Sequence, residues 1–183
     1  WDEPMKKSQE TGWLRNMLSL GQKRQSQTSE LLYASAVDLA RNPMFFKDFG
    51  VADNVDGRFD CLALCVSLVM RRLKALDAEG AALSQQLFDT MFADMDLTLR
   101  EMGAGDIGVS KRVRVMAEGF TGRLNAYAGA LDENDRAALK AALERNLLRG
   151  DAVAEDGLVD FVIALDQQVQ AIGAKNILSG QLA

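Results

Sequence analysis

The sequence predicts an all-α fold, a single-domain bundle of about six to seven helices. Three observations support this prediction. Helix-favouring Ala, Leu, Met and Arg are abundant, the two prolines lie at Pro4 and Pro43, and apolar residues recur with the helical period. A chain of 183 residues, 48% hydrophobic and 26% charged, is also long enough to bury one sizeable core.

The composition divides the chain into three parts. Residues 1–26 are polar and are expected to form a weakly ordered arm, in which 13–21 make a short amphipathic helix. Contact of this arm with a membrane surface or a partner is the alternative. Residues 27–174 carry the helical periodicity and form the domain, while 175–183 form a tail that is expected to fray.

The first half of the domain holds two helices and an aromatic connector. One helix is predicted over about 28–42, where Pro43 stops it. The connector 44–51, MFFKDFGV, contains three phenylalanines and is expected to plug the edge of the core, or else to form an exposed contact site. The helix near 57–74 is apolar almost all round, so it is predicted to be the buried centre of the bundle.

The second half of the domain is predicted to contain four helices. The apolar stripe of the first runs from Phe88 to Met102 and ends before a glycine-rich turn. The second begins at Ser110 as N-cap, and close approach of another helix is the expected reason for its Gly119 and Gly122. Their predicted spans are about 79–102, from Ser110 onward, 133–149 and 154–172.

Three cations stand where the helix after the glycine turn is predicted to begin: Lys111, Arg112 and Arg114. The positive end of the helix dipole disfavours each by roughly 0.3–1 kcal/mol. Two explanations follow. Either acidic residues of the preceding helix reach across the turn and neutralise them, or the turn presents them to an anionic partner. The acidic residues concerned are Asp94, Asp96 and Glu101.

Most catalytic chemistry is excluded by composition. The chain has no histidine, which removes Ser–His catalysis and the commonest zinc ligand, and it contains no P-loop or nucleophile-elbow motif. Cys61 and Cys65 lie one helical turn apart among apolar neighbours and are expected to be reduced core residues. A net charge of −5 argues against DNA binding. We therefore predict no enzyme, no metal and no cofactor.

Two pairs of acidic residues have a spacing that bears on catalysis or metal binding. Asp56 and Asp60 are four residues apart, so a helix brings both to one side, as acid–base chemistry requires. The other interpretation is solvated carboxylates at a helix start, or an ion pair with Arg58. Asp94 and Asp96 are two residues apart and point about 200° away from each other on a helix, so they cannot share a metal ion.

Four methionines fall on the apolar stripes of the two helices that flank the glycine turn. Core filling is one interpretation of them. A groove between the two helices that binds varied apolar segments is the other, because the methionine side chain is flexible and polarizable. These residues are Met91, Met95, Met102 and Met116.

A known sequence pattern occurs in two stretches, VADNVDGRFDCLALCVSLVMRRLK (51–74) and LFDTMFADMDLTLREMGAGDIGVSKRVRVMAEGFTGRLNAY (87–127). The two most characteristic parts of this pattern are DGRFD before an apolar helix and the basic segment GDIGVSKR after the glycine turn. With this pattern the chain resembles the ubiquinol–cytochrome c chaperone family of bacteria and mitochondria. The resemblance extends from the N-terminal helix to beyond Tyr127, and it is weak over 1–26 and 150–183.

The resemblance implies a non-enzymatic assembly factor. Mitochondrial members of the family bind newly made cytochrome b and help to build the cytochrome bc1 complex. The implied partners are cytochrome b or another apolar membrane-protein client, a small partner protein, the ribosome or an anionic membrane surface. The implied location is the cytoplasmic side of the bacterial inner membrane, or the matrix side of the mitochondrial one.

The resemblance supplies no catalytic residues, so the site prediction concerns binding. In the client hypothesis, acidic residues face basic loops of a membrane protein, methionines cover its apolar part, and basic residues meet an anionic partner. One alternative is a helical scaffold whose motif charges pair internally; another is a carboxylate enzyme acting on a lipid-like ligand. The candidate residues are Asp56, Arg58, Asp60, Met91, Asp94, Met95, Asp96, Arg100, Glu101, Asp106, Lys111, Arg112 and Arg114.

Overall fold

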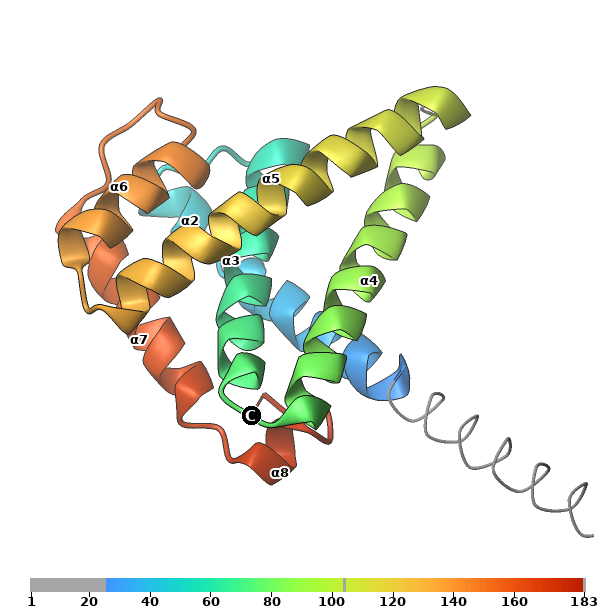
Figure 1. Ribbon diagram of the computed structural model, residues 1–183. Helices are drawn as coiled ribbons and strands as arrows, with labels where there is room; N and C mark the ends of the chain where they lie inside the picture. The colour runs from blue at the N-terminus through green and yellow to red at the C-terminus, as the bar shows by residue number, and fades with distance from the viewer. Residues whose placement is uncertain (1–25, 104, 183) are drawn as a thin grey trace, which may run out of the picture.

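The structure is a computed structural model that describes residues 26–103 and 105–182 (Figure 1). Every regular element in this described part is a helix, which confirms the all-α prediction. The predicted arm lies outside the described residues, apart from Ser26. The helices are a first helix over 26–40, α2 (Met44–Lys47), α3 (Val55–Lys74), α4 (Ala78–Glu101), α5 (Asp106–Asp132), α6 (Arg136–Asn146), α7 (Asp156–Gln170) and α8 (Ala174–Ile177).

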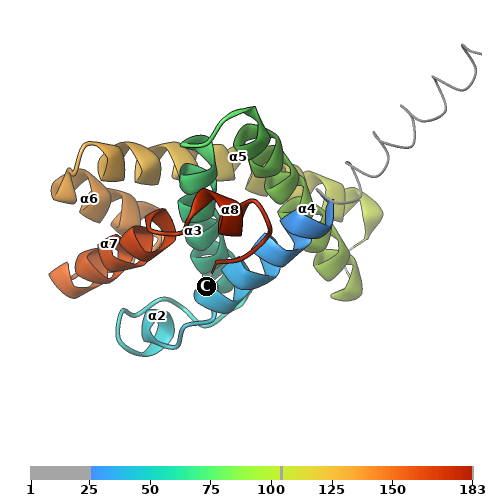
Figure 2. The same ribbon diagram turned by 90° about the horizontal axis from the view of Figure 1, so that it is seen from below.

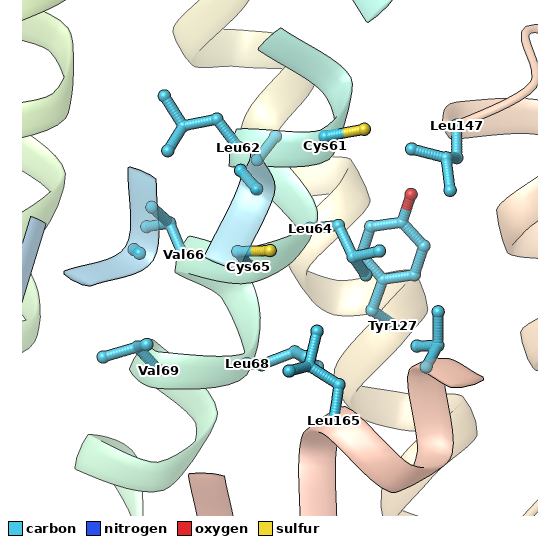
Figure 3. Packing of buried hydrophobic residues seen from close by; sticks show 14 of the residues in the cluster. Cys61, Leu62, Leu64, Cys65, Val66, Leu68, Val69, Tyr127, Leu147 and Leu165 are labelled. Carbon is cyan, nitrogen blue, oxygen red and sulfur yellow. The ribbon is translucent and has the colours of Figure 1, made fainter. Parts of the chain in front are cut away.

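Helix α3 is the centre of the bundle, as its sequence predicts. It packs against α4, α5 and α7, and residues 59–69 are all buried. Asn54 caps its start by accepting a hydrogen bond from the backbone N–H of Gly57 at 2.8 Å. Figure 3 shows side chains of α3, α5 and α7 meeting around Leu64, Tyr127 and Leu165. An all-round apolar helix therefore becomes the common core of its neighbours.

The other helices surround α3 on different sides. Helices α4 and α5 form a hairpin whose glycine-turn end projects from the body, while α6 and α7 lie on the opposite side (Figure 1). The first helix packs along α4 (Figure 2), where the hydroxyls of Ser29 and Thr90 are 3.0 Å apart. One edge of the molecule is thus built by elements that are distant in the sequence.

The aromatic connector plugs the core edge, as predicted. Phe45 of α2 is completely buried and meets the Phe161 ring edge-on, with ring centroids 5.2 Å apart. Phe49 lies against the same ring at 5.3 Å. The connector consequently anchors α2 to α7.

Helix α5 begins earlier than predicted. Its N-cap is Gly105 and its first residue is Asp106, so Ser110 lies inside the helix and the predicted start was wrong. An acidic residue therefore occupies the position that the helix dipole favours. Lys111 and Arg112 move into the second turn, where the dipole effect has largely faded. The apparent conflict between these cations and the helix dipole arose because the start of α5 was predicted too late in the sequence.

Two interpretations of the α4–α5 hairpin were also wrong, namely that Met102 fills the core and that another helix approaches Gly119 and Gly122. Met102 is 58% exposed, because it lies at the C-cap of α4 beyond the packed stripe. No second helix approaches the glycines of α5. A Cβ on Gly119 would meet Nη1 of Arg123 at 2.9 Å, and one on Gly122 would have no neighbour within 4 Å. Gly119 leaves room for the guanidinium group of Arg123, rather than for another helix.

The C-terminal segment is more ordered than a fraying tail. Residues 174–177 form the short helix α8, in which Ile177 is completely buried. Gly180 has a φ of 89° and lies so close to Leu31 that a Cβ would come within 2.8 Å of that side chain. The end of the described chain is therefore docked onto the first helix.

Candidate functional site

A groove of about 690 Å³ opens at the edge where the first helix meets the α4–α5 hairpin. The end of the first helix, α2 and the first turns of α3 form one side, and the C-terminal half of α4 with the first half of α5 forms the other. Most of the lining is apolar. It includes Val37, Phe46, Phe59, Leu62, Met95, Leu99, Met102 and Met116.

Methionines form the wall contributed by α4 and α5. Three of the four predicted methionines, Met95, Met102 and Met116, line the groove. Met91 does not, because it is completely buried in the core. A wall of unbranched, polarizable side chains adjusts to apolar groups of different shape.

Tyr33 and Asp94 form a polar contact inside the groove. The Tyr33 hydroxyl donates to Oδ2 of Asp94 at 2.6 Å. Burial, followed by this carboxylate, raises the pKa of Tyr33 well above its ordinary value, so the phenol remains protonated. Asp94, a predicted site residue, is thus already engaged by the first helix.

Four basic residues stand on the rim of the groove: Arg41, Lys47, Arg58 and Arg112. Arg58 Nε donates to Asp53 at 2.7 Å, and this contact lowers the pKa of Asp53. The prediction that Arg58 pairs with Asp56 or Asp60 was wrong, because Asp53 in the loop before α3 lies nearer. Among the described residues, the lining contains the carboxylates of Asp53 and Asp94, while Asp38 and Asp56 pair with Arg41 and Arg112 from outside it.

A second cluster of charges is centred on a buried carboxylate, although its member Arg149 is 43% exposed. Asp60 of α3 has no exposed surface and accepts from Arg123 Nη2 at 3.0 Å and Arg149 Nε at 2.6 Å. Burial raises the pKa of Asp60, while the two guanidinium groups oppose the shift. Arg149 also reaches Asp56 at 3.6 Å. The cluster ties α3, α5 and the α6–α7 loop together.

Two different carboxylates pair with Arg112 and Arg114. Arg112 Nη2 donates to Oδ1 of Asp56 at 3.1 Å, because α5 packs on α3 as well as on α4. Arg114 Nε donates to Glu118 of its own helix at 2.8 Å. Neutralisation by Asp94, Asp96 or Glu101 was therefore a wrong prediction.

The remaining candidates lie on the surface of the hairpin. Asp96 and Arg100 form an ion pair one turn apart at 2.5 Å. Glu101 and Lys111 are exposed, and neither lines the groove. The side chain of Asp106 lies outside the described part of the structure.

Sequence reasoning missed Arg123 and Arg149. Their partner Asp60 lies 63 and 89 residues away in the chain, so no local spacing connects them. Tyr33 was missed for the same reason, since 61 residues separate it from Asp94. The one available signal was Asp60 itself, an acidic residue among apolar neighbours in a central helix, which requires a partner.

The structure gives little support to the alternative of a carboxylate enzyme. Asp56 and Asp60 are near each other but are held by arginines, and Asp60 is not accessible. Among the described residues, no group of three or more His, Cys, Asp or Glu could hold a metal ion.

Within residues 26–103 and 105–182, none of the helices combines the length and the apolar character that spanning a bilayer requires.

Comparison with known proteins agrees with the fold and with the motifs. The chain is similar to the crystal structure of the Cbp3 homolog from Brucella abortus, with 34% identity, a TM-score of 0.77, and coverage of 91% of this chain and 93% of that one. No curated protein matches the chain. The model of the family described as ubiquinol-cytochrome C chaperone matches residues 47–183, well beyond the stretch in which the motifs are clear. The chain therefore belongs to the ubiquinol-cytochrome C chaperone family.

Proposed function

We propose that this protein is an assembly chaperone of the cytochrome bc1 complex whose groove holds an apolar segment of newly made cytochrome b. Family membership and the likeness to the Cbp3 homolog support the chaperone role. The observation that carries the client-binding part is the open apolar groove with a methionine wall. In this proposal the protein works at the surface of the membrane that receives the client.

The shape of the groove suits a helical client segment. Its lining comes from five helices and the loop before α3, so apolar contacts lie along an extended surface. An amphipathic or apolar helix docks into such a surface through side chains spaced three, four and seven residues apart. Exposed Met102, at the mouth of the groove, is a natural first contact for such a helix.

The scaffold function remains as a second candidate because the motif charges pair internally. Asp56, Asp60 and Asp96 each have an arginine partner, and Arg114 has Glu118. These charges hold the fold together in either function. Acidic residues facing basic loops of the client are accordingly not part of the proposal.

A photocrosslinking amino acid at position 102 tests the proposal against the scaffold. We expect cells that make cytochrome b to yield a covalent adduct of the chaperone with cytochrome b. The same amino acid at position 97 is the control, because Leu97 is exposed to a similar extent on the same helix but does not line the groove. Equal labelling at both positions, or a complete lack of cytochrome b at 102, would contradict the client function.

Loss of function supplies the complementary measurement. We expect Met102→Lys to lower the amount of assembled bc1 complex, measured from haem b absorbance in membranes, while Leu97→Lys leaves it unchanged. Thermal unfolding of both purified variants checks that each still folds, since both side chains are solvent-exposed. Normal assembly in the Met102→Lys strain would favour the scaffold.

A further inference from the structure

The first helix contributes one face to the groove. Its groove residues recur every three or four positions, as residues on one side of a helix do. Figure 2 shows this helix (blue) lying along α4, so the groove follows the helix axis for about 12 Å between positions 33 and 41. The residues of this face are Tyr33, Val37, Ala40 and Arg41.

The charges around the groove are balanced, so they do not select an occupant. Three arginines of the lining hold carboxylates of their own, in the pairs Arg41–Asp38, Arg58–Asp53 and Arg112–Asp56. The apolar wall is therefore the feature that chooses what binds. It suits a segment with several large apolar side chains and few charges.

A segment of this chain before the described residues has this composition. Residues 13–20, WLRNMLSL, contain five large apolar side chains and one charge, Arg15. With helical spacing, Trp13, Met17 and Leu20 fall at positions i, i+4 and i+7, the anchors of a helix that docks into a groove. Positions 33, 37 and 40 of the first helix repeat the same spacing.

The connection between this segment and the first helix has the length of a helix–helix turn. Gly21 follows the segment, and residues 22–25 lead to the start of the first helix at Ser26. Loops of about two to five residues join antiparallel helices, and glycine commonly ends the first of the two. Five residues span up to about 17 Å, whereas the first helix advances only about 10 Å from Ser26 to Tyr33. The segment can therefore turn back and lie along 33–41.

We propose that residues 13–20 fold back as a helix and occupy the groove of their own chain while no client is bound. Displacement of the segment by a client is the part of this inference that rests on the proposed function. A short connection gives an effective concentration of about 1 mM, so a contact with a Kd of about 0.1 mM is about 90% filled. Such a weak contact covers the apolar wall and still yields to a client that binds more tightly.

The tryptophans provide a probe of this contact. Trp1 and Trp13 are the two tryptophans of the chain, and both precede Ser26, so Trp1→Phe leaves Trp13 as the single one. We expect Trp13 in the full chain to emit at shorter wavelength, and to be less quenched by acrylamide, than Trp13 in a free peptide of residues 11–22. Equal emission and equal quenching in the two would overturn the proposal.

Two lysine substitutions test whether the protection comes from the groove. Met17→Lys in the segment and Met102→Lys in the groove should each weaken the contact about tenfold, because a charge enters an apolar contact, so about half of the protection is lost. Ser19→Lys and Leu97→Lys are matched controls. Ser19 falls on the polar side of the segment, and Leu97 does not line the groove. An equal loss in the controls would overturn the proposal.

Two further measurements separate this occupant from others. Protection of Trp13 that is independent of protein concentration supports docking within one chain. Protection that disappears on dilution, together with a dimer in sedimentation, would overturn the proposal in favour of a second copy. Protection that arises only with phosphatidylglycerol vesicles would overturn it in favour of a membrane surface.

The outcomes also distinguish this inference from the proposed function. A cytochrome b adduct at position 102 with an unprotected Trp13 overturns the inference and leaves the client groove standing. A protected Trp13 without any adduct supports the self-contact and contradicts the client function. Where both hold, Met17→Lys should raise the yield of the adduct by up to about fivefold, because the free groove rises from about 10% to about half. An unchanged yield would overturn displacement by the client.

Discussion

Asp60 and Arg149 lie 2.6 Å apart, from Oδ2 to Nε, although 89 residues separate them in the chain. The contact joins the most buried helix to the loop between α6 and α7. Arg149 holds it with a φ of 56°, a conformation that non-glycine residues adopt at some energetic cost. The hydrogen bonds of the buried Asp60 carboxylate with Arg149 and Arg123 offset this cost.

The first prediction concerns the charge of Asp60. Although burial raises the pKa of Asp60, we expect Asp60→Asn to lower the free energy of unfolding by about 2–4 kcal/mol, because the single amide oxygen cannot pair with both Arg123 and Arg149, which are then left without a shared anion. Urea unfolding measures this loss, and thermal unfolding should show a fall in Tm of about 2–4 °C per kcal/mol. Asp53→Asn is the control, since its pair with Arg58 is exposed and its loss should change little. Equal effects of the two substitutions would contradict a structural role for the buried cluster.

The second prediction concerns Gly57 in the DGRFD motif. A Cβ at this position would collide with the carbonyl oxygen of Ala52 and lie 3.0 Å from its carbon. We expect Gly57→Ala to cost about 1–3 kcal/mol, as overpacking does. Gly122→Ala has open space, and within a helix it should stabilise by about 0.5–1 kcal/mol. Thermal unfolding of the two variants should show shifts of opposite sign, and a loss in both would contradict this account.

The third prediction concerns alkaline pH. Burial raises the pKa of the Cys61 thiol to about 12 and that of Cys65 further, whereas thiols of the unfolded chain ionise near pH 8.5. The folded state therefore retains protons that the unfolded state releases. Stability is full below about pH 8.5 and is lost as the pH rises toward the folded pKa.

Urea unfolding between about pH 7 and 10 measures this loss. The tyrosines add to it, because burial also raises the pKa of Tyr33 and Tyr127. The double variant Cys61→Ala/Cys65→Ala should fall less steeply between about pH 8.5 and 10, although it starts from a lower stability. Between about pH 6 and 8 stability should be nearly constant, because the chain has no histidine. A steep change in stability between about pH 6 and 8 would contradict the assignment of the pH dependence to the buried thiols and phenols.

The fourth prediction concerns Tyr33 and Asp94. We expect Tyr33→Phe to destabilise the protein by about 1.5–3 kcal/mol, because a partly buried carboxylate loses its donor. Asp94→Asn keeps an acceptor oxygen and should cost less. Denaturant unfolding compares the two variants. A larger loss for Asp94→Asn would mean that the charge of Asp94, rather than its hydrogen bond, is what the groove wall requires.

Apolar periodicity was sufficient to predict the longer helices, because helices are local, whereas the four-residue helices α2 and α8 were not predicted. The all-round apolar segment near 57–74 became α3, and Pro43 stopped the first helix. The start of α5 failed because both Gly105 and Ser110 are acceptable caps and the local sequence does not choose between them. The choice depends on how the hairpin packs against the rest of the fold.

The candidate site was predicted only in part, because its polar contacts are long-range. The methionines at 95, 102 and 116 could be placed near a groove from their helical spacing. The pairing of Asp56 with Arg112 could not be predicted from the sequence, since it depends on how α5 packs against α3. Arg41 and Lys47 were not singled out, because isolated surface cations carry no local pattern until the fold assembles them on one rim.

Gly119 and Gly122 divide the long helix α5 into two parts. They lie between Met116, which belongs to the groove wall, and Tyr127, which is anchored in the core. Each glycine weakens the helix by about 0.5–1 kcal/mol relative to alanine, so α5 bends most easily at this point. The two glycines therefore separate the part of α5 that lines the groove from the part that is anchored in the core.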